Sequence, residues 1–186
     1  MKRCDWCTSN ELMQKYHDEE WGLPVHDDKK HFEFLVLEAA QAGLNWLIVL
    51  KKRENYKKAF ANYDLNKISK LNKKDIEKMM NNPGIIRNRL KIESAISNVI
   101  PFKKVQKEFG SFDKYLWGFV NNKPITNKFS SIKELPAKTE LSDKVSNDLK
   151  KRGFKFVGST VIYAHLQAVG IVNDHLTNCF RHKEVQ

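Results

Sequence analysis

Two thiols and two imidazoles at opposite ends of the chain have the composition of a metal site. Cys4 and His17 lie near the start, and His175 and Cys179 lie near the end. We expect His175 and Cys179 to share one face of a helix, since they are four residues apart. Two thiolates and two neutral imidazoles complete the tetrahedral shell of a structural zinc ion. The sequence therefore predicts a zinc site that ties the chain ends together, with ordinary core cysteines and surface histidines as the alternative.

Two further residues compete for this site on spacing alone. Cys4 and Cys7 form a Cys-x-x-Cys pair, itself a common metal-ligand spacing, and His182 lies close in sequence to His175. Three cysteines also make a poor disulfide framework, because one is left over. We therefore expect reduced thiols in a cytoplasmic setting, with the ligand set left open by the spacing.

An acidic residue, Glu38, interrupts a stretch that is otherwise apolar at helical spacing. A charged carboxylate among such neighbours is costly unless it has a partner or a role. Aromatic residues concentrate in the same part of the chain, namely Trp6, Tyr16, Trp21 and Trp46. Ring faces together with a carboxylate make a pocket suited to a flat cation. The alternative is that the tryptophans belong to the core and that Glu38 pairs with a lysine.

Two glycines five residues apart, Gly153 and Gly158, bound a short hairpin between two expected helices. Glycine allows a tight turn and lets the backbone approach a ligand closely. The amides before the second helix suit a phosphate oxygen, because they carry the positive end of the helix dipole. Positive charge surrounds the hairpin at Lys150, Lys151, Arg152 and Lys155. The segment predicts binding to a DNA backbone without recognition of base sequence. The alternative is a helical hairpin with no ligand, whose lysines are solvated.

The charge balance supports a polyanionic partner. Lys and Arg number 33 against 22 Asp and Glu, a formal net charge of +11. The lysines are spread along the chain and form no single basic amphipathic helix, which disfavours a membrane surface. No apolar run approaches the roughly 18–20 residues of a membrane-spanning helix, and the N-terminus has no signal-like segment. We therefore expect nucleic acid and no membrane as the partner.

The elements that must position these groups are predicted to be helices. Hydrophobic residues make up 41% of 186 residues, enough for a buried core in one domain. Periodicity and capping residues predict helices over residues 29–42, 46–60, 72–81, 85–100, 112–120, 142–152, 159–170 and 173–179. Residues 121–139 are polar, contain two prolines and are predicted to be a connector. Because no alternating strand pattern stands out, the predicted fold class is all-α.

Several strings at separate places in the chain match one enzyme family. They are RCxW from Arg3, YHDxEWG from Tyr16, LExxQAGLxW from Leu37, LKKRENY from Leu50, GIIR from Gly84, LKKRGFKFVG from Leu149 and VNDH from Val172. Over nearly its whole length the chain thus resembles the bacterial DNA-3-methyladenine glycosylase I enzymes. The resemblance implies a divergent helix-hairpin-helix glycosylase, a single domain over residues 1–186 whose two helical lobes receive the target base between them.

The resemblance also assigns roles to individual residues. It implies a zinc site made of Cys4, His17, His175 and Cys179, without Cys7 or His182. It matches Glu38 to the acid that contacts methylated adenine, Tyr16 to a hydrogen-bonding partner, Trp46 to a stacking platform, and Trp6 and Trp21 to further rings of the pocket. Gly43 and Leu44 match a turn whose leucine fills the gap left by an extruded nucleotide. The residues that grip DNA are then Gly153, Lys155 and Gly158.

The implied reaction is hydrolysis of the N-glycosidic bond of 3-methyladenine in double-stranded DNA, with base flipping and release of the free base. Methylation at N3 gives the base a positive charge and makes it a good leaving group. Ser159 and Thr160 follow Gly158 where strand-cutting relatives carry a lysine, so a monofunctional enzyme is expected, acting as a monomer. Asp174 is the rival catalytic acid. The rival function is a noncatalytic zinc-stabilised DNA-binding module, which leaves the acid among aromatics unexplained.

Overall fold

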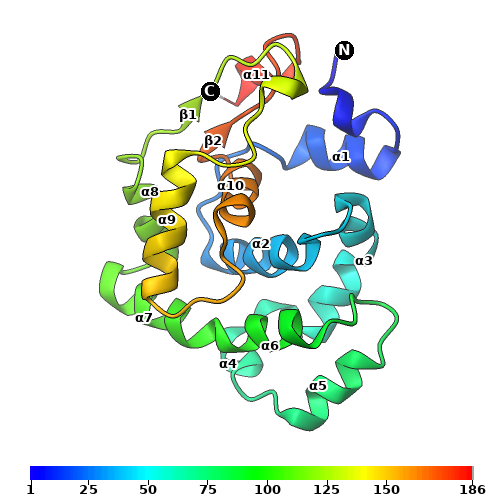
Figure 1. Cartoon of the computed structure of the whole chain (residues 1–186), viewed down its shortest axis with the longest axis vertical. Coiled ribbons are helices and arrows are strands. Elements are labelled where there is room, and N and C mark those ends of the chain that lie inside the picture. Colours follow the sequence, from blue (N-terminus) through cyan, green and yellow to red (C-terminus); the bar gives the residue numbers. More distant parts are fainter. Residues whose placement is uncertain (186) are drawn as a thin grey trace.

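In the computed structural model, which describes residues 1–185, helices make up most of the chain (Figure 1). The α-helices are α1 (Glu11–Glu19), α2 (Asp28–Gln41), α3 (Trp46–Ala59), α4 (Leu65–Ile68), α5 (Lys73–Met80), α6 (Arg89–Ser97), α7 (Val99–Phe109), α8 (Phe112–Gly118), α9 (Glu140–Lys151), α10 (Ser159–Ala168) and α11 (Arg181–Glu184). Short 3-10 turns cover Asp5–Cys7, Ala61–Tyr63 and Ile132–Glu134. Strands β1 (Ile125–Thr126) and β2 (Val172–Asn173) form one parallel pair. The predominance of helix agrees with the prediction, whereas the short strand pair was not predicted.

Helix α2 lies at the centre of the molecule (Figure 1). Every residue from His31 to Ala40 is buried, and the helix packs against α3, α6, α8 and α10. A helix that is apolar on nearly all sides must be surrounded by other elements. Glu38 therefore has no solvated helix face to occupy. Among the described residues, no helix is long and apolar enough to cross a membrane.

Helices α9 and α10 pack against each other and are joined by residues 152–158. Gly153 ends α9 with a φ of +96°, a left-handed conformation that glycine adopts without strain. The side chain of Asn98 holds the connection: its Nδ2 donates to the Lys155 carbonyl at 3.0 Å, and the Lys155 N–H donates to its Oδ1 at 2.8 Å. Ser146 Oγ donates to the Val157 carbonyl at 2.6 Å. The side chains of Asn98 and Ser146 thus hold the hairpin backbone in place.

The segment predicted as one helix over residues 85–100 is divided in the structure. Residues 85–88 are not helical, because the Ile86 N–H donates to the Tyr56 hydroxyl and Asn88 caps α6. The helix is interrupted again at Asn98, which lies between α6 and α7 and whose side chain bonds to the Lys155 backbone. Helix α7 follows this interruption, and Pro101 fits within its first turn, where a missing N–H costs nothing.

Helix α9 begins earlier than predicted. Its N-cap is Thr139, and Ser142, the first residue of the predicted range, is the third helical residue. The two side chains exchange hydrogen bonds with each other's backbone: the Thr139 N–H donates to Ser142 Oγ at 2.8 Å, and the Ser142 N–H donates to Thr139 Oγ1 at 3.2 Å. This reciprocal capping box uses both hydroxyls and starts the helix two residues before the predicted range.

The helix predicted over residues 173–179 is wrong. Asn173 belongs to strand β2, which pairs with β1, and the Asn173 side chain donates to the His182 carbonyl at 3.0 Å. The Thr177 N–H donates to the Phe129 carbonyl at 2.9 Å, which holds the chain against the long connector. His175 and Cys179 therefore lie on an irregular segment before α11, and their expected helical spacing does not bring them together.

Candidate active site and metal cluster

A pocket of about 340 Å³ opens between the N-terminal segment, α2, α3 and α10. Its walls hold aromatic, amide and acidic side chains: Trp6, Met13, Tyr16, Trp21, Glu38, Gln41, Asn45, Trp46, Leu135, Ala164 and Gln167. All five residues expected to bind the base are among them. The fold thus brings together five side chains that lie up to 40 positions apart in the sequence.

The aromatic rings of the pocket form a connected wall. The ring centroids of Trp6 and Trp21 lie 5.1 Å apart in an edge-on arrangement, and those of Tyr16 and Trp46 lie 5.3 Å apart with planes tilted by 52°. Trp6 joins the two pairs, since its ring lies 6.3 Å from that of Tyr16. Tilted rings at these distances are favourable pairs that also leave ring faces for a flat ligand. The wall is suited to stacking.

Glu38 is 4% exposed on α2 and lines this pocket. Within residues 1–185 it forms no ion pair, so the expected alternative of a lysine partner is wrong. Burial raises the pKa of Glu38 to about 8, because the charged form loses its hydration without gaining a counter-ion. Burial, and next the nearby Glu38 charge, raise the pKa of Tyr16. A cation entering the pocket would supply the missing partner.

Arg53, which does not line the pocket, joins the helices that carry these groups. Its guanidinium donates to both carboxylate oxygens of Glu20, at 2.7 and 2.8 Å, and its Nε donates to Glu33 at 2.8 Å. The guanidinium also lies 5.5 Å from the ring centroid of Phe34. Glu20 follows α1, Glu33 lies on α2 and Arg53 lies on α3. Sequence reasoning assigned no role to this cluster, although Glu20 and Arg53 both fall within the matched strings.

The turn between α2 and α3 projects from the surface beside the pocket. Gly43 has a φ of +78°, and Leu44 is 41% exposed although it is a large apolar side chain. Lys91 on α6 holds the turn, since its Nζ donates to the carbonyls of Ala40 at 2.8 Å and Ala42 at 2.6 Å. Sequence reasoning missed Lys91, because nothing in its own surroundings marks it. The turn thus exposes an apolar side chain, and Lys91 holds its backbone in place.

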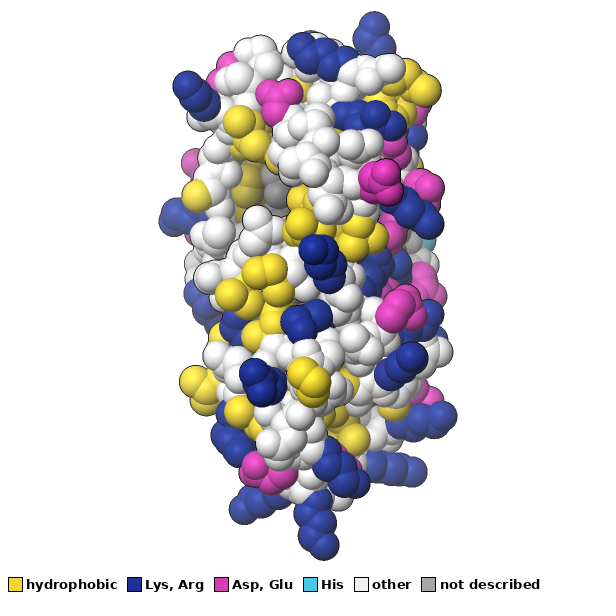
Figure 2. Space-filling model, turned by 90° about the vertical axis from the view of Figure 1, so that its right-hand side faces the viewer, with side chains coloured by type: hydrophobic (Ala, Val, Ile, Leu, Met, Phe, Trp, Pro, Cys, Tyr) yellow, Lys and Arg dark blue, Asp and Glu magenta, His cyan; other side chains and the backbone are white. Residues whose placement is uncertain are grey.

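Figure 2 shows the side of the molecule that includes α3 and α5. Lysine and arginine side chains surround exposed hydrophobic ones on this face, and its upper half is hollowed. Such a surface combines electrostatic attraction for phosphates with apolar groups that can contact bases.

The hairpin between α9 and α10 presents Lys150, Lys151 and Lys155 to solvent. Arg152 is not free, because it donates to Asp148 at 2.6 Å and to Glu108 at 2.7 Å. Gly158 has an ordinary φ of −61°, and a Cβ there would meet nothing within 4 Å. Its backbone therefore does not require glycine, unlike that of Gly153. The absence of a side chain leaves an open approach to the N-terminus of α10.

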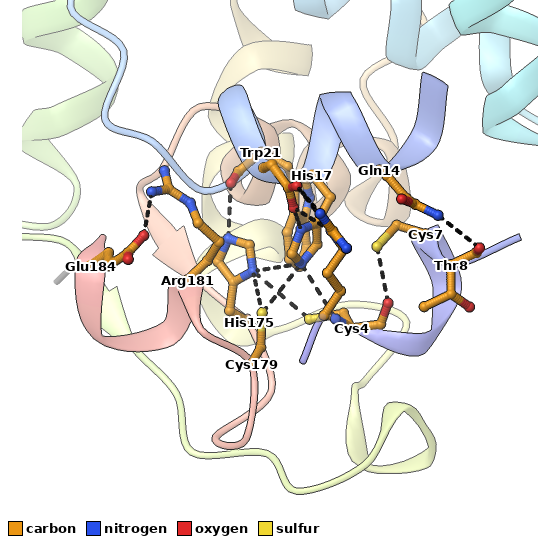
Figure 3. A network of polar contacts seen from close by, with 12 residues as sticks. Cys4, Cys7, Thr8, Gln14, His17, Trp21, His175, Cys179, Arg181 and Glu184 are labelled. Atoms are coloured by element: carbon orange, nitrogen blue, oxygen red, sulfur yellow. Dashed lines mark hydrogen bonds and ion pairs between the residues drawn. The ribbon is translucent and has the colours of Figure 1, made fainter. Parts of the chain in front are cut away.

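The four expected metal ligands meet at one buried point (Figure 3). One donor atom from each of Cys4, His17, His175 and Cys179 lies within 4.8 Å of the others. His17 Nε2 is 3.2 Å from His175 Nδ1 and 3.4 Å from Cys179 Sγ, and His175 Nδ1 is 3.8 Å from Cys4 Sγ. In a tetrahedral zinc site such atoms lie about 3.3–3.8 Å apart. The residues fit a metal ion.

Neighbouring groups turn both imidazoles toward that point. His17 Nδ1 is 2.7 Å from the Asp18 carboxylate, which leaves Nε2 facing the cluster. His175 Nε2 donates to the Trp21 carbonyl at 2.9 Å, which leaves Nδ1 facing it. Such outer partners are usual for metal-bound histidines. The second contact also links the cluster to a wall of the pocket.

The competing residues lie outside the cluster. The Cys7 thiol donates to the Cys4 carbonyl at 3.1 Å, and His182 Nε2 contacts the Asn127 carbonyl at 2.9 Å. Asp174, the rival catalytic acid, does not line the pocket. It is 1% exposed and accepts hydrogen bonds from Asn127, Tyr163 and Gln167. Its carboxylate is fully occupied inside the protein.

Comparisons with known proteins agree with the resemblance. A sequence model described as methyladenine glycosylase matches residues 6–182. The chain is 44% identical over 179 residues to DNA-3-methyladenine glycosylase 1 of Escherichia coli (strain K12), covering 96% of each chain. A crystal structure of 3-methyladenine DNA glycosylase I superposes with a TM-score of 0.93 and 45% identity, covering 96% of this chain and 98% of that one. A variant of such an enzyme in complex with 3-methyladenine superposes with a TM-score of 0.92 and 34% identity, covering 97% of each.

Proposed function

We propose that this chain, which belongs to the methyladenine glycosylase family, is a DNA-3-methyladenine glycosylase that excises the base from alkylated double-stranded DNA. The observation that carries the proposal is the buried carboxyl of Glu38, which forms no ion pair with any described residue and lies in a pocket walled by four aromatic rings. This combination favours a flat cation, and 3-methyladenine in DNA is one. An unmodified adenine brings no charge to compensate the desolvated carboxylate.

The reaction is hydrolysis of the bond between the sugar C1′ and the base nitrogen. The bond electrons leave with the base, which neutralises its positive charge, while a water oxygen bonds to C1′ and one water proton is released. Because the departing base is already cationic, little acid catalysis is needed. Glu38 stabilises the positive charge of the bound base, Tyr16 hydrogen-bonds to it, and Trp46 stacks on it, with Trp6 and Trp21 enclosing the ring.

Access to the base requires that the nucleotide leave the duplex. In this proposal Leu44 fills the gap; its exposure on the turn between α2 and α3 and the support of that turn by Lys91 favour this role. Unstacking costs a few kcal/mol, and a damaged base reduces that cost. Gly153, Lys155 and Gly158 grip the DNA backbone. In this proposal α9, the hairpin and α10 are the helix-hairpin-helix unit, and the base enters between two lobes of one domain spanning residues 1–186.

The enzyme is proposed to be monofunctional. Strand cleavage in related glycosylases uses a lysine nucleophile, whereas Ser159 and Thr160 follow the hairpin here. No lysine is among the described residues that line the pocket. We therefore assign hydrolysis alone, with an intact abasic sugar as the DNA product. The proposed setting is the cytoplasm, and the proposed oligomeric state is a monomer.

The metal cluster has a structural role in this proposal. Cys4, His17, His175 and Cys179 would hold one Zn²⁺, and four protein ligands leave no position for a reacting water. Bound zinc would stabilise the junction of the chain ends and, through His175, the backbone at Trp21.

The proposal is tested by incubating the protein with duplex DNA treated with a methylating agent and identifying the released base by mass spectrometry. Release of 3-methyladenine without strand breaks is expected, and untreated DNA is the control. DNA binding with no released base would favour the noncatalytic zinc-stabilised binding module instead.

A further inference from the structure

Gln167 on α10 lines the base pocket and is anchored from behind by a buried acid. Its Nε2 donates to Asp174 Oδ2 at 2.7 Å. The same carboxylate accepts from Asn127 Nδ2 at 2.7 Å and from the Tyr163 hydroxyl. The backbone is fixed as well, because the Gln167 carbonyl accepts from the Gly22 N–H at 3.1 Å. Both ends of this residue are thereby held.

The anchor sets which way the side-chain amide faces. A carboxylate only accepts hydrogen bonds, so the NH₂ group of Gln167 must face Asp174 and its Oε1 must face away. Among the described residues, none donates a hydrogen bond to this oxygen, and it is not sealed from solvent. Gln41, the other glutamine in the pocket, has no such anchor in the described part of the chain, so its amide is free to turn over. Gln167 is thus a pocket acceptor of fixed direction.

We propose that Gln167 is a specificity-determining residue that accepts a hydrogen bond from the exocyclic amino group of the alkylated adenine. The inference rests on the proposed function. Ring stacking and charge attraction by themselves bind any flat cationic purine and do not distinguish adenine from guanine. Adenine carries a donor at position 6, whereas guanine carries a carbonyl oxygen there. An acceptor of fixed orientation therefore favours the amino group of adenine and repels the carbonyl oxygen of guanine. Rotating the amide to present its NH₂ group would break the hydrogen bond to Asp174.

The test compares two substrates that differ at position 6. Duplex oligonucleotides carrying one 3-methyladenine or one 3-methylguanine are incubated with the wild-type protein and with Gln167→Met, and kcat/KM is measured for each base. The variant keeps the length of the side chain and removes its acceptor. We expect the preference for 3-methyladenine to fall about tenfold or more. Gln106→Met is the matched control, because Gln106 Nε2 also donates to a carboxylate, Asp28, at 2.7 Å, outside the pocket. It should keep the wild-type ratio.

The ratio of the two activities separates base reading from mere support of the fold, which would lower both activities together. If Gln167→Met does not fold, Gln167→Asn serves in its place, since it keeps the amide and withdraws the oxygen from the pocket. An unchanged ratio in an active Gln167 variant overturns the inference and leaves the proposed function intact. Failure of the wild-type protein to release either base overturns both.

Discussion

Arg53 and Glu20 form two parallel hydrogen bonds, 2.7 and 2.8 Å long, between the guanidinium and the carboxylate. This pair joins the end of α1 to the middle of α3, and the bond from Arg53 to Glu33 adds α2. These are the three helices that present Tyr16, Glu38 and Trp46 to the pocket. The ion cluster thus fixes the elements on which the spacing between acid and aromatic rings depends.

We predict that Arg53→Met lowers the free energy of unfolding by about 3 kcal/mol, because it leaves two partly buried carboxylates without their main partner. Arg89→Met is the control. Arg89 pairs with Glu77 on the surface, and such an exposed pair contributes less than about 1 kcal/mol. Urea unfolding measures both changes. Equal, small losses would show that the Arg53 cluster does not support the fold.

Removal of the metal should loosen both chain ends. We predict that one zinc ion per chain is found by elemental analysis and that a strong chelator lowers the Tm. Cys4→Ser should lose the metal because one of four ligands is gone, while Cys7→Ser should keep it, since the Cys7 thiol donates to the Cys4 carbonyl and is not one of the four clustered ligands. Metal retention in Cys4→Ser would contradict the assigned ligand set.

Leu44→Ala should reduce excision from duplex DNA without affecting the pocket. The smaller side chain no longer fills the gap left by an extruded nucleotide, so we expect kcat/KM on duplex substrate to fall by about tenfold or more. Binding of free 3-methyladenine, measured by tryptophan fluorescence, should stay unchanged. Ile100→Ala on α7 alters a side chain that is also exposed, and it should leave both measurements as they are.

The stability of the protein should fall in mild acid because of His165. Its ring is fully buried and neither nitrogen has a partner in the described structure, and burial holds the pKa of His165 well below 6.5. The folded chain therefore keeps the ring neutral while the unfolded chain protonates it below about pH 6.5. Each further pH unit then costs about 1.4 kcal/mol. Urea unfolding of wild type and His165→Phe between pH 7.5 and 5.5 should show a shallower decline in the variant; parallel declines would exclude His165.

The helices with clear apolar periodicity could be predicted from the sequence. The bounds of α2 and α3 agree within one residue, because local capping by Asp27 and Asn45 decides them. The start of α6 and the interruption at Asn98 could not be predicted, since both residues bond to partners distant in sequence. No helix was expected before residue 29, although α1 carries two of the residues assigned to the sites.

The candidate site illustrates the same difference. His175 and Cys179 do converge with Cys4 and His17, but through a strand pair and an irregular segment instead of the expected helix. Residue chemistry proposed them and the family resemblance preferred them to Cys7 and His182, while tertiary contacts determined how they meet. The contact between Asp174 and Gln167 could not be predicted from the sequence. It orients the Gln167 amide, and that orientation is seen only in the folded structure.

The central claim is that the Glu38 carboxylate selects a cationic purine. It is tested most directly by the pH dependence of kcat/KM for 3-methyladenine release, which reports the ionisation of the free enzyme. Because burial raises the pKa of Glu38 to about 8, the active carboxylate form grows as pH rises. The wild-type profile should therefore increase from pH 6 and level off above about pH 8, and Glu38→Gln should be at least tenfold slower with a flat profile. A Glu38→Gln protein with wild-type activity and the same rising profile would contradict the account.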